Sequence, residues 1–281
     1  MSKQTLPKGA EHLLKSLRRY AYVCLEPLDY VARIVNGKKD FPPLHLRRYV
    51  GPLRTFEMSG AEFMVHLQTI CNLQPRERVF DIGCGCGLMA LHLLDFLDSQ
   101  GGYAGVDVHK PSVTWCQRNI GDRYQNFEFA HIDFQNDVYN SRGVDRSSNF
   151  AFPFADQTFD CILLKSVFTH MRPEAVDCYL KEAARLLAPR GHCLATFFLL
   201  NEQQESLARR GLNRLQFNYG DAVWRYAQKN SPESAVAFNE DYVRELLRKN
   251  GLTLARPTLY GRWAGLPSGL SFQDMMLLQR Q

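Results

Sequence analysis

A glycine-rich loop between a predicted strand and a predicted helix places the strongest constraint on the fold of this chain. The segment from Val79 to Ala90 reads VFDIGCGCGLMA, in which an apolar strand runs into Gly83, Gly85 and Gly87 and a helix follows at once. Glycines at such a turn let the backbone approach a ligand closely, and the free N–H groups of the helix N-terminus lie beside it. The pattern therefore predicts an α/β fold with a small-molecule site after this strand.

Predicted strands and helices alternate from residue 78 onward. Short apolar stretches predict strands at residues 78–82, 103–108, 127–132, 159–164 and 192–200. Helices are expected at 87–97, 111–124, 173–187 and 238–250. Two last strands, 253–263 and 271–279, are joined by a loop rich in glycine and proline and form a terminal hairpin. This alternation is typical of βαβ units and predicts a parallel sheet with right-handed crossovers.

Two segments do not follow this alternation of strands and helices. Before residue 75, apolar positions at helical spacing predict a helix over 11–35 with a break at Glu26-Pro27, and another helix over 57–73. Later, residues 201–237 form an aromatic-rich insertion that we expect to be helical. The predicted organisation is an N-terminal helical cap or lid at 1–74, followed by an α/β domain at 75–281 that carries the insertion.

Positive charge is concentrated in the first 60 residues. Eleven lysines and arginines and five acidic residues there give a net charge of +6, whereas the rest of the chain carries −1 of the total of +5. Such a segment could attract phosphate, nucleic acid or a membrane surface, or could be a solvated helical face. Aromatic residues are not interleaved with the cations as in RNA-binding modules, so no nucleic-acid partner is expected.

The hydropathy pattern and the cysteines indicate a soluble cytoplasmic protein. The longest apolar stretch is far too short to span a membrane, and the N-terminus has no secretory apolar region. The eight cysteines include no C-x-x-C pair, and Cys84-x-Cys86 lies in the glycine loop, where two metal ligands would be poorly presented. We therefore expect reduced thiols, no disulfides and no metal site.

Two acidic residues near the loop distinguish between two classes of cofactor. A dinucleotide fold has the spacing G-x-G-x-x-G, with a pyrophosphate at the helix N-terminus, whereas the spacing here is G-x-G-x-G. Asp81 would repel a pyrophosphate but suits a cationic amino-acid group. Asp107 closes the next strand, 24 residues after Gly83, where an acid can accept both hydroxyls of a ribose. These features favour S-adenosylmethionine (SAM), whose ammonium and sulfonium groups are both positive.

From Val79 to the C-terminus the sequence resembles the class I, seven-stranded SAM-dependent methyltransferases. Four stretches carry the resemblance, namely DIGCGCG (81–87), GVDVHK (105–110), AHIDF (130–134) and FPFADQTFDCILLKSVFTHM (152–171). LLAPRGH (186–192) differs from the usual Lys-Pro-Gly-Gly turn but retains a proline and a glycine that favour a turn. The resemblance implies an α/β fold with a seven-stranded, mostly parallel sheet, an antiparallel terminal hairpin, helices on both faces and a helical cap. Residues 232–238, 260–265 and 271–277 are similar to a bacterial-type subgroup that acts on small molecules or glycans.

The same resemblance implies which residues hold the cofactor and its product, S-adenosylhomocysteine. The first motif would bind the amino-acid end through Asp81, Gly83, Cys84, Gly85 and Gly87. Asp107 would bind the ribose hydroxyls. The adenine and the remaining wall of the site would involve Val108, Asp133, Phe134, Lys165, Ser166 and Val167. The helix segment 56–63 would fold over the cofactor as a lid.

Methyl transfer is an in-line displacement at a sulfonium carbon, and much of its rate comes from alignment and desolvation. A hydroxyl acceptor also needs a base, and His170, just past the fourth strand, is the candidate. His170 could instead cap the next helix or close the cofactor pocket. Metal-assisted catechol methylation would need carboxylates where Lys165 and Ser166 stand, so a metal-independent O-methyltransferase is predicted.

The methyl acceptor is expected to meet the insertion at 201–237. Aromatic residues with arginines suit a sugar ring, a phenolic metabolite or an anionic group, and the candidate substrate residues are Arg214, Tyr219, Trp224 and Tyr226. Trp224 could equally pack in the core of the cap. N-methylation of a small amine or protein side chain, and a SAM-binding partner subunit without turnover, remain alternatives. A homodimer is also left open.

Overall fold

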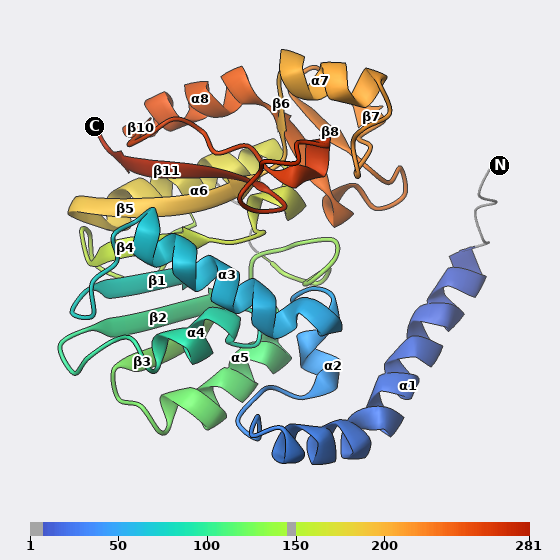
Figure 1. Cartoon of the computed structure of the whole chain (residues 1–281), viewed down its shortest axis with the longest axis vertical. Coiled ribbons are helices and arrows are strands. Elements are labelled where there is room, and N and C mark those ends of the chain that lie inside the picture. The colour runs from blue at the N-terminus through green and yellow to red at the C-terminus, as the bar shows by residue number, and fades with distance from the viewer. Residues whose placement is uncertain (1–7, 145–149) are drawn as a thin grey trace.

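A seven-stranded sheet forms the centre of the molecule (Figure 1). The computed structural model describes residues 8–144 and 150–281, with the backbone alone described for residues 8–20. Its strand order is β10-β11-β5-β4-β1-β2-β3. These strands are β1 (Arg78–Ile82), β2 (Gly102–Asp107), β3 (Phe127–His131), β4 (Phe159–Leu164), β5 (Leu187–Phe197), β10 (Leu252–Leu254) and β11 (Asp274–Arg280).

The strand directions confirm the predicted sheet. The pairs β1–β2, β2–β3, β1–β4 and β4–β5 are parallel, whereas β11 runs antiparallel to both β5 and β10. The chain first builds the sheet outward from β1 to β3 and then crosses to β4 on the other side of β1. In open α/β sheets, ligands bind beyond the carboxyl ends of the strands at such a reversal.

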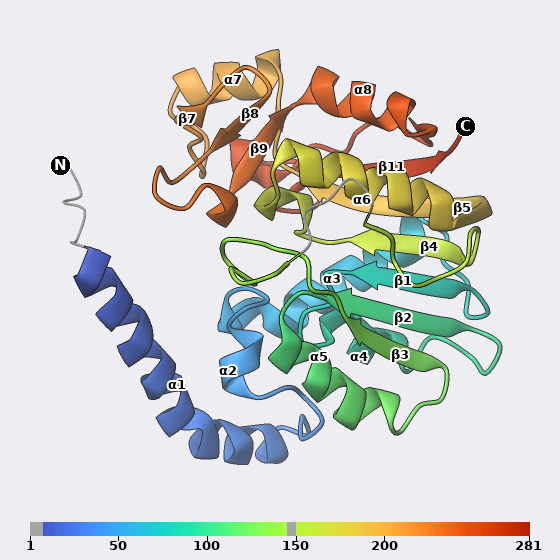
Figure 2. The ribbon, with the colours of Figure 1, turned by 180° about the vertical axis from the view of Figure 1, so that it is seen from behind.

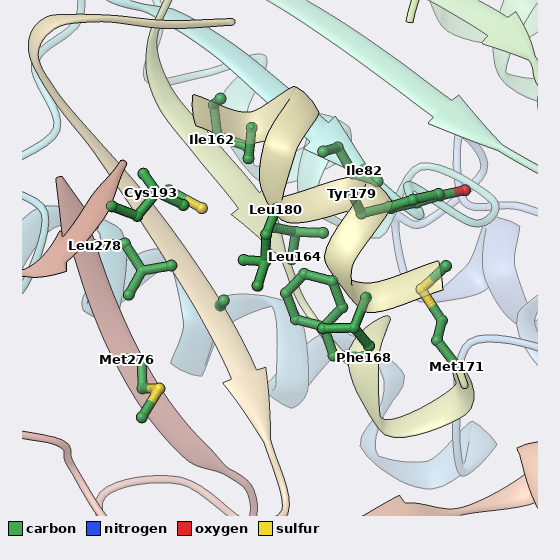
Figure 3. Close-up of a cluster of buried hydrophobic side chains, with 14 of the residues drawn as sticks. Ile82, Ile162, Leu164, Phe168, Met171, Tyr179, Leu180, Cys193, Met276 and Leu278 are labelled. Carbon is green, nitrogen blue, oxygen red and sulfur yellow. The ribbon is translucent and has the colours of Figure 1, made fainter. Parts of the chain in front are cut away.

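Helices cover both faces of the sheet, because alternate residues of a strand point to opposite faces. On one face, Val79 of β1 packs in a core with α3 (Phe56–Thr69), α4 (Leu88–Leu93) and α5 (Lys110–Cys116). On the other face, Phe80 packs with α6 (Pro173–Leu186) and α8 (Glu240–Lys249), which Figure 2 shows from behind. Figure 3 shows part of this second core, where Leu180 of α6 lies against Leu164 of β4 and Phe168.

The N-terminal segment differs from the prediction in one respect. α1 (Lys8–Val35) is a single helix that continues through Pro27, where a break was expected. A proline removes one helical hydrogen bond and bends a helix, and Figure 1 shows that α1 changes direction along its length. α2 (Leu44–Arg47) and the short 3₁₀ helix η1 (Leu53–Thr55) then lead into α3. Figures 1 and 2 both show α1 standing apart from the body of the fold.

Residues 201–237 hold one α-helix, one 3₁₀ helix, two strands and the start of a third, so the expectation of a helical insertion is wrong for most of its length. α7 (Glu202–Arg209) begins after Asn201, whose side chain accepts hydrogen bonds from two N–H groups of its first turn. A second sheet has the order β6-β9-β8-β7. Its strands are β6 (Leu199–Leu200), β7 (Tyr219–Gly220), β8 (Trp224–Tyr226) and β9 (Val236–Asn239). Large aromatic side chains favour strands because they pack well on a pleated surface.

The remaining differences are local. α5 continues into a turn of π-helix, η2 (Gln117–Gly121), and the segment between β10 and β11 is mostly loop with the 3₁₀ helix η5 (Arg262–Ala264). Two further 3₁₀ helices are η3 (Phe168–His170) and η4 (Pro232–Ser234). The polar sequence of residues 135–149 predicts a surface loop, and residues 145–149 of this loop lie outside the described residues. None of the described helices is long and apolar enough to cross a membrane.

Candidate functional site

A cavity of about 820 Å³ lies beyond the carboxyl ends of β1, β2 and β4. Most of its lining comes from five parts of the chain: the glycine loop after β1, the end of β2, the segment 132–139 after β3, the turn after β4, and the segment that runs from Arg48 to Phe63. Arg262 and residues 271–273, from the loop between β10 and β11, complete the wall. The topology thus brings the motifs singled out in the sequence to one cavity.

The glycine loop lies so close to its neighbours that side chains do not fit there. Gly83 and Gly85 have φ angles of +80° and +54°, in the left-handed region that favours glycine. A Cβ on Gly83 would lie 2.5 Å from Cγ2 of Val167, and one on Gly85 would lie 2.8 Å from Cγ2 of Val50. The loop is therefore held between the turn after β4 and the N-terminal segment, with its backbone facing the cavity.

Asp107 lies at the end of β2 with its carboxylate held by two backbone N–H groups. Gly85 donates to Oδ2 at 2.8 Å, and His109 donates to Oδ1 at 2.7 Å. Burial raises the pKa of Asp107 above its usual range, while the two N–H donors act in the opposite sense. The oriented carboxylate lines the cavity and keeps lone pairs for hydroxyl donors.

Asp81 lies behind the cavity rather than on its wall. Its carboxylate is almost fully buried and accepts a hydrogen bond from the hydroxyl of Tyr103 at 2.7 Å. Burial raises the pKa of Asp81 to about 6. Three other predicted cofactor residues, Cys84, Gly87 and Asp133, are also outside the lining, whereas the remaining eight lie on it: Gly83, Gly85, Asp107, Val108, Phe134, Lys165, Ser166 and Val167.

The turn after β4 is fixed by hydrogen bonds to β5, to the loop before β11 and to α3. Ser166 has a φ of +59°, unusual for a residue with a side chain, and its N–H donates to Oγ1 of Thr196 in β5 at 2.7 Å. Its hydroxyl donates to Oε1 of Gln273 at 2.9 Å. Lys165 donates to Oγ of Ser59 at 2.9 Å, and burial lowers the pKa of its ammonium group. A backbone outlier held in this way is characteristic of a functional site.

His170 ends the short η3 helix on the same wall of the cavity. Its Nδ1 lies 3.0 Å from the carbonyl oxygen of Glu233, and its ring packs edge-on against Tyr139. Because a carbonyl oxygen accepts only, Nδ1 carries the proton and Nε2 of the neutral ring keeps its lone pair. Burial lowers the pKa of His170, against smaller opposing effects of the Glu233 and Ser234 backbone.

The N-terminal segment contributes more of the wall than the sequence indicated. Within the cap predicted at 1–74, only the segment 56–63 was expected to fold over the cofactor, but the lining begins at Arg48 and includes Tyr49, whose ring lies 4.4 Å from that of His109. Glu62 of α3 forms an ion pair with Arg262 at 3.4 Å, which connects the lid to the C-terminal loop over the cavity. The charge of Arg48 could not have identified it as a lining residue, because lysines and arginines are frequent throughout the N-terminal segment.

The C-terminal loop was singled out in the sequence but given no role there. Arg262 lies in the stretch 260–265 and Gln273 in 271–277, both similar to the bacterial-type subgroup. In the structure, Gln273 bridges the turn after β4, accepting from Ser166 and donating to Oγ1 of Thr169 at 3.4 Å. Asn136 and Tyr139 also line the cavity, although their polar stretch gave no signal of this.

The candidate substrate residues of the insertion lie outside the cavity lining. Tyr219 and Tyr226 stack across β7 and β8, and Trp224 packs beside Tyr226 and against the core below α8. Arg214 donates its backbone N–H to the carbonyl oxygen of Trp263. Contacts of these four residues with an acceptor therefore stay a prediction.

Within the described ranges, His, Cys, Asp and Glu side chains form no group of three or more that could hold a metal ion. The eight cysteines are free, and six of them are buried. Burial raises the pKa of Cys84, Cys86 and Cys116 around the glycine loop. These thiols are therefore protonated and contribute to packing.

Comparisons with known proteins agree with this geometry. A family model described as a methyltransferase domain matches residues 79–191. A curated protein, the tRNA N(3)-cytidine methyltransferase METTL2 of Gallus gallus, is 24% identical over 178 residues, which are 62% of this chain and 42% of that protein. The chain thus spans less than half the length of this relative.

Solved structures with the same fold come from several organisms. The PH0226 protein of Pyrococcus horikoshii OT3 has a TM-score of 0.54 and 16% identity, covering 80% of this chain and 91% of that one. A magnesium protoporphyrin IX methyltransferase from Synechocystis PCC 6803, solved with bound S-adenosylhomocysteine, has a TM-score of 0.51 and 17% identity, covering 84% and 92%. At these identities the likeness is one of fold.

Proposed function

The chain has the class I SAM-dependent methyltransferase fold, and on that premise we propose that it transfers a methyl group to a hydroxyl of a small molecule or glycan. The matched domain supports a SAM-dependent methyltransferase enzyme with SAM as its cofactor. In this proposal residues 75–281 form the transferase domain, and residues 1–74 form its cap. The cytoplasmic location expected from the sequence stays a prediction.

The residues of the cavity suit SAM. Asp107 presents a fixed carboxylate to the ribose hydroxyls, and the backbone of Gly83 and Gly85 forms a cradle that a Cβ would fill. Val108 and Phe134 provide apolar surface for the adenine. Asp81 would act on the ammonium group through its charge from behind the loop, since its carboxylate does not reach the cavity wall. When bound, SAM supplies an electrophilic methyl group on a sulfonium.

The observation that carries the proposal is the 3.0 Å contact between Nδ1 of His170 and the carbonyl oxygen of Glu233. The Glu233 carbonyl fixes the proton on Nδ1, so Nε2 can take the proton of an acceptor hydroxyl as its oxygen attacks the methyl carbon. Burial keeps the ring neutral near pH 7, as a base requires. Lys165 and Ser166, rather than carboxylates, stand at the end of β4, which supports a reaction without a metal.

A second candidate is methylation of a nucleic acid, favoured by the match to a tRNA cytidine methyltransferase. The positive charge of the first 60 residues agrees with it. N-methylation of a small amine or protein side chain, and a SAM-binding subunit without turnover, are the remaining alternatives. For turnover of an amine, His170 would be dispensable, because a neutral amine attacks without a base.

Transfer of a labelled methyl group from SAM tests the proposal. Purified protein is offered glycans, phenols and other hydroxyl compounds in one series, and tRNA or amines in two others. We expect transfer to a hydroxyl compound that His170→Gln reduces by roughly 10²–10⁴-fold. Transfer to tRNA or an amine with His170→Gln fully active would contradict the hydroxyl acceptor. S-Adenosylhomocysteine binding without transfer to any series would favour the non-catalytic subunit.

A further inference from the structure

The described part of α1 has its charged face turned inward and its apolar face turned outward. Between residues 21 and 35, the positions turned toward the body are Tyr22, Glu26, Asp29 and Arg33, which follow a helical stripe. The other eleven positions are all exposed, and none of them carries a charge. In a surface helix of a globular protein the apolar stripe normally faces the core.

Specific contacts fix this orientation. Arg33 is buried, forms an ion pair with Asp29 at 2.8 Å and donates to the carbonyl oxygen of Phe41 at 2.6 Å. Asp29 also pairs with Arg47 of α2. Glu26 accepts from the N–H of Leu44 at 3.1 Å, at the N-terminus of α2, and lies 3.1 Å from Nδ1 of His45. The helix therefore cannot turn its apolar face inward without breaking a buried ion-pair network.

The outward face is apolar along its whole described length. Leu28, Val31 and Val35, which are one turn apart, are 68%, 57% and 79% exposed. Val23, Tyr30 and Ile34 widen the stripe, each about half exposed. Apolar patches of this extent on a soluble chain mark a surface that binds something apolar.

We propose that α1 lies on an anionic lipid surface with this apolar face buried among the lipid chains. Charge complementarity selects this occupant. The same first 60 residues that carry the stripe hold a net charge of +6, while the rest of the chain holds −1. An anionic membrane surface binds an apolar helix face that belongs to a basic segment, through apolar burial together with attraction of the segment to lipid headgroups.

The other occupants fit less well. A second copy of the chain would bring two segments of charge +6 together, which costs free energy in an isologous contact. A nucleic acid binds through cations that contact phosphates, and the outward stripe between residues 21 and 35 offers none. The lipid surface alone uses both the apolar stripe and the charge.

Co-sedimentation of the full chain with vesicles tests the proposal. We expect binding to vesicles of phosphatidylcholine mixed with phosphatidylglycerol, weaker binding to phosphatidylcholine alone, and a loss of binding as salt is raised. Leu28→Asp with Val31→Asp should reduce binding by about ten-fold or more, because two apolar side chains that enter the lipid on binding become charged. Leu212→Asp with Val144→Asp, at exposed apolar positions away from α1, is the matched control and should bind like wild type.

Thermal unfolding and S-adenosylhomocysteine binding should be the same in both variants, since none of the four substituted residues lines the cavity. Equal binding to both kinds of vesicle would contradict the role of the charge. No vesicle binding, or a dimer in light scattering that Leu28→Asp with Val31→Asp dissociates, would overturn the proposal. The result does not depend on whether the chain is an active transferase.

Discussion

The Nδ1 atom of His170 lies 3.0 Å from the carbonyl oxygen of Glu233, although the two residues are 63 positions apart. The first lies after β4 and the second in η4, just before β9. The connection between β8 and β9 of the second sheet therefore determines which nitrogen of the histidine carries the proton. Arg172 strengthens this junction through its ion pair with Glu233 at 3.1 Å.

This contact predicts how activity depends on pH. A base must be neutral, and burial holds the pKa of His170 below its ordinary value of 6.5. Activity should therefore fall as pH decreases through a pKa below 6.5, since the protonated ring has no free lone pair. In His170→Gln this acidic limb should disappear while S-adenosylhomocysteine binding persists. If the activity of the variant still fell at acid pH as in wild type, a group other than His170 would be responsible for the pH dependence.

The glycine loop predicts a second outcome. Gly85→Ala places a Cβ 2.8 Å from Val50 at a φ of +54° and should weaken S-adenosylhomocysteine binding by roughly ten-fold while lowering the free energy of unfolding by about 1–2 kcal/mol. Gly37→Ala is the control, because its φ is +70° with no atom within 4 Å. It should lose similar stability but bind normally. Equal binding losses in both variants would contradict a cradle at Gly85.

Asp81 predicts a pH dependence of stability in the absence of cofactor. Its pKa is raised from 3.8 to about 6 by burial, so the folded state holds this proton more tightly than the unfolded state. Its contribution to stability is thus lost as pH rises from about 4 to above 6. Asp81→Asn cannot ionise, and its unfolding free energy relative to wild type should increase across this window by up to roughly 3 kcal/mol. Denaturant unfolding at several pH values would show a constant difference if Asp81 were ionised throughout.

The sequence predicted those parts of the fold and site that depend on local pattern. β1, β4 and α6 begin and end within a residue of the expected positions, because their apolar runs are bounded by turns or prolines. Asp107 and His170 could be selected because the first ends a strand and the second follows one, and the carboxyl ends of these strands meet at one edge of a parallel sheet. The break in α1 was wrong because a proline bends a long helix without ending it.

Other features depend on tertiary contacts that no local pattern encodes. Arg262 and Gln273 reach the cavity only because β11 lies beside β5 and returns the loop before it to the carboxyl edge of the sheet. The insertion was predicted as helical, but Trp224 and Tyr226 form a strand by pairing with β9. The inward orientation of the charged face of α1 could not be predicted either, because helical spacing does not determine which face of a helix packs against the rest of the protein.

Heat of S-adenosylhomocysteine binding to the purified protein tests the central claim most directly. Wild type should bind with a Kd in the micromolar range, of the order of −8 kcal/mol, and NADH should not bind. Asp107→Ala should abolish the binding, whereas Asp95→Ala, which removes an exposed carboxylate outside the lining, should leave it unchanged. Wild-type binding that survives in folded Asp107→Ala, or a preference for NADH, would contradict the SAM site described above.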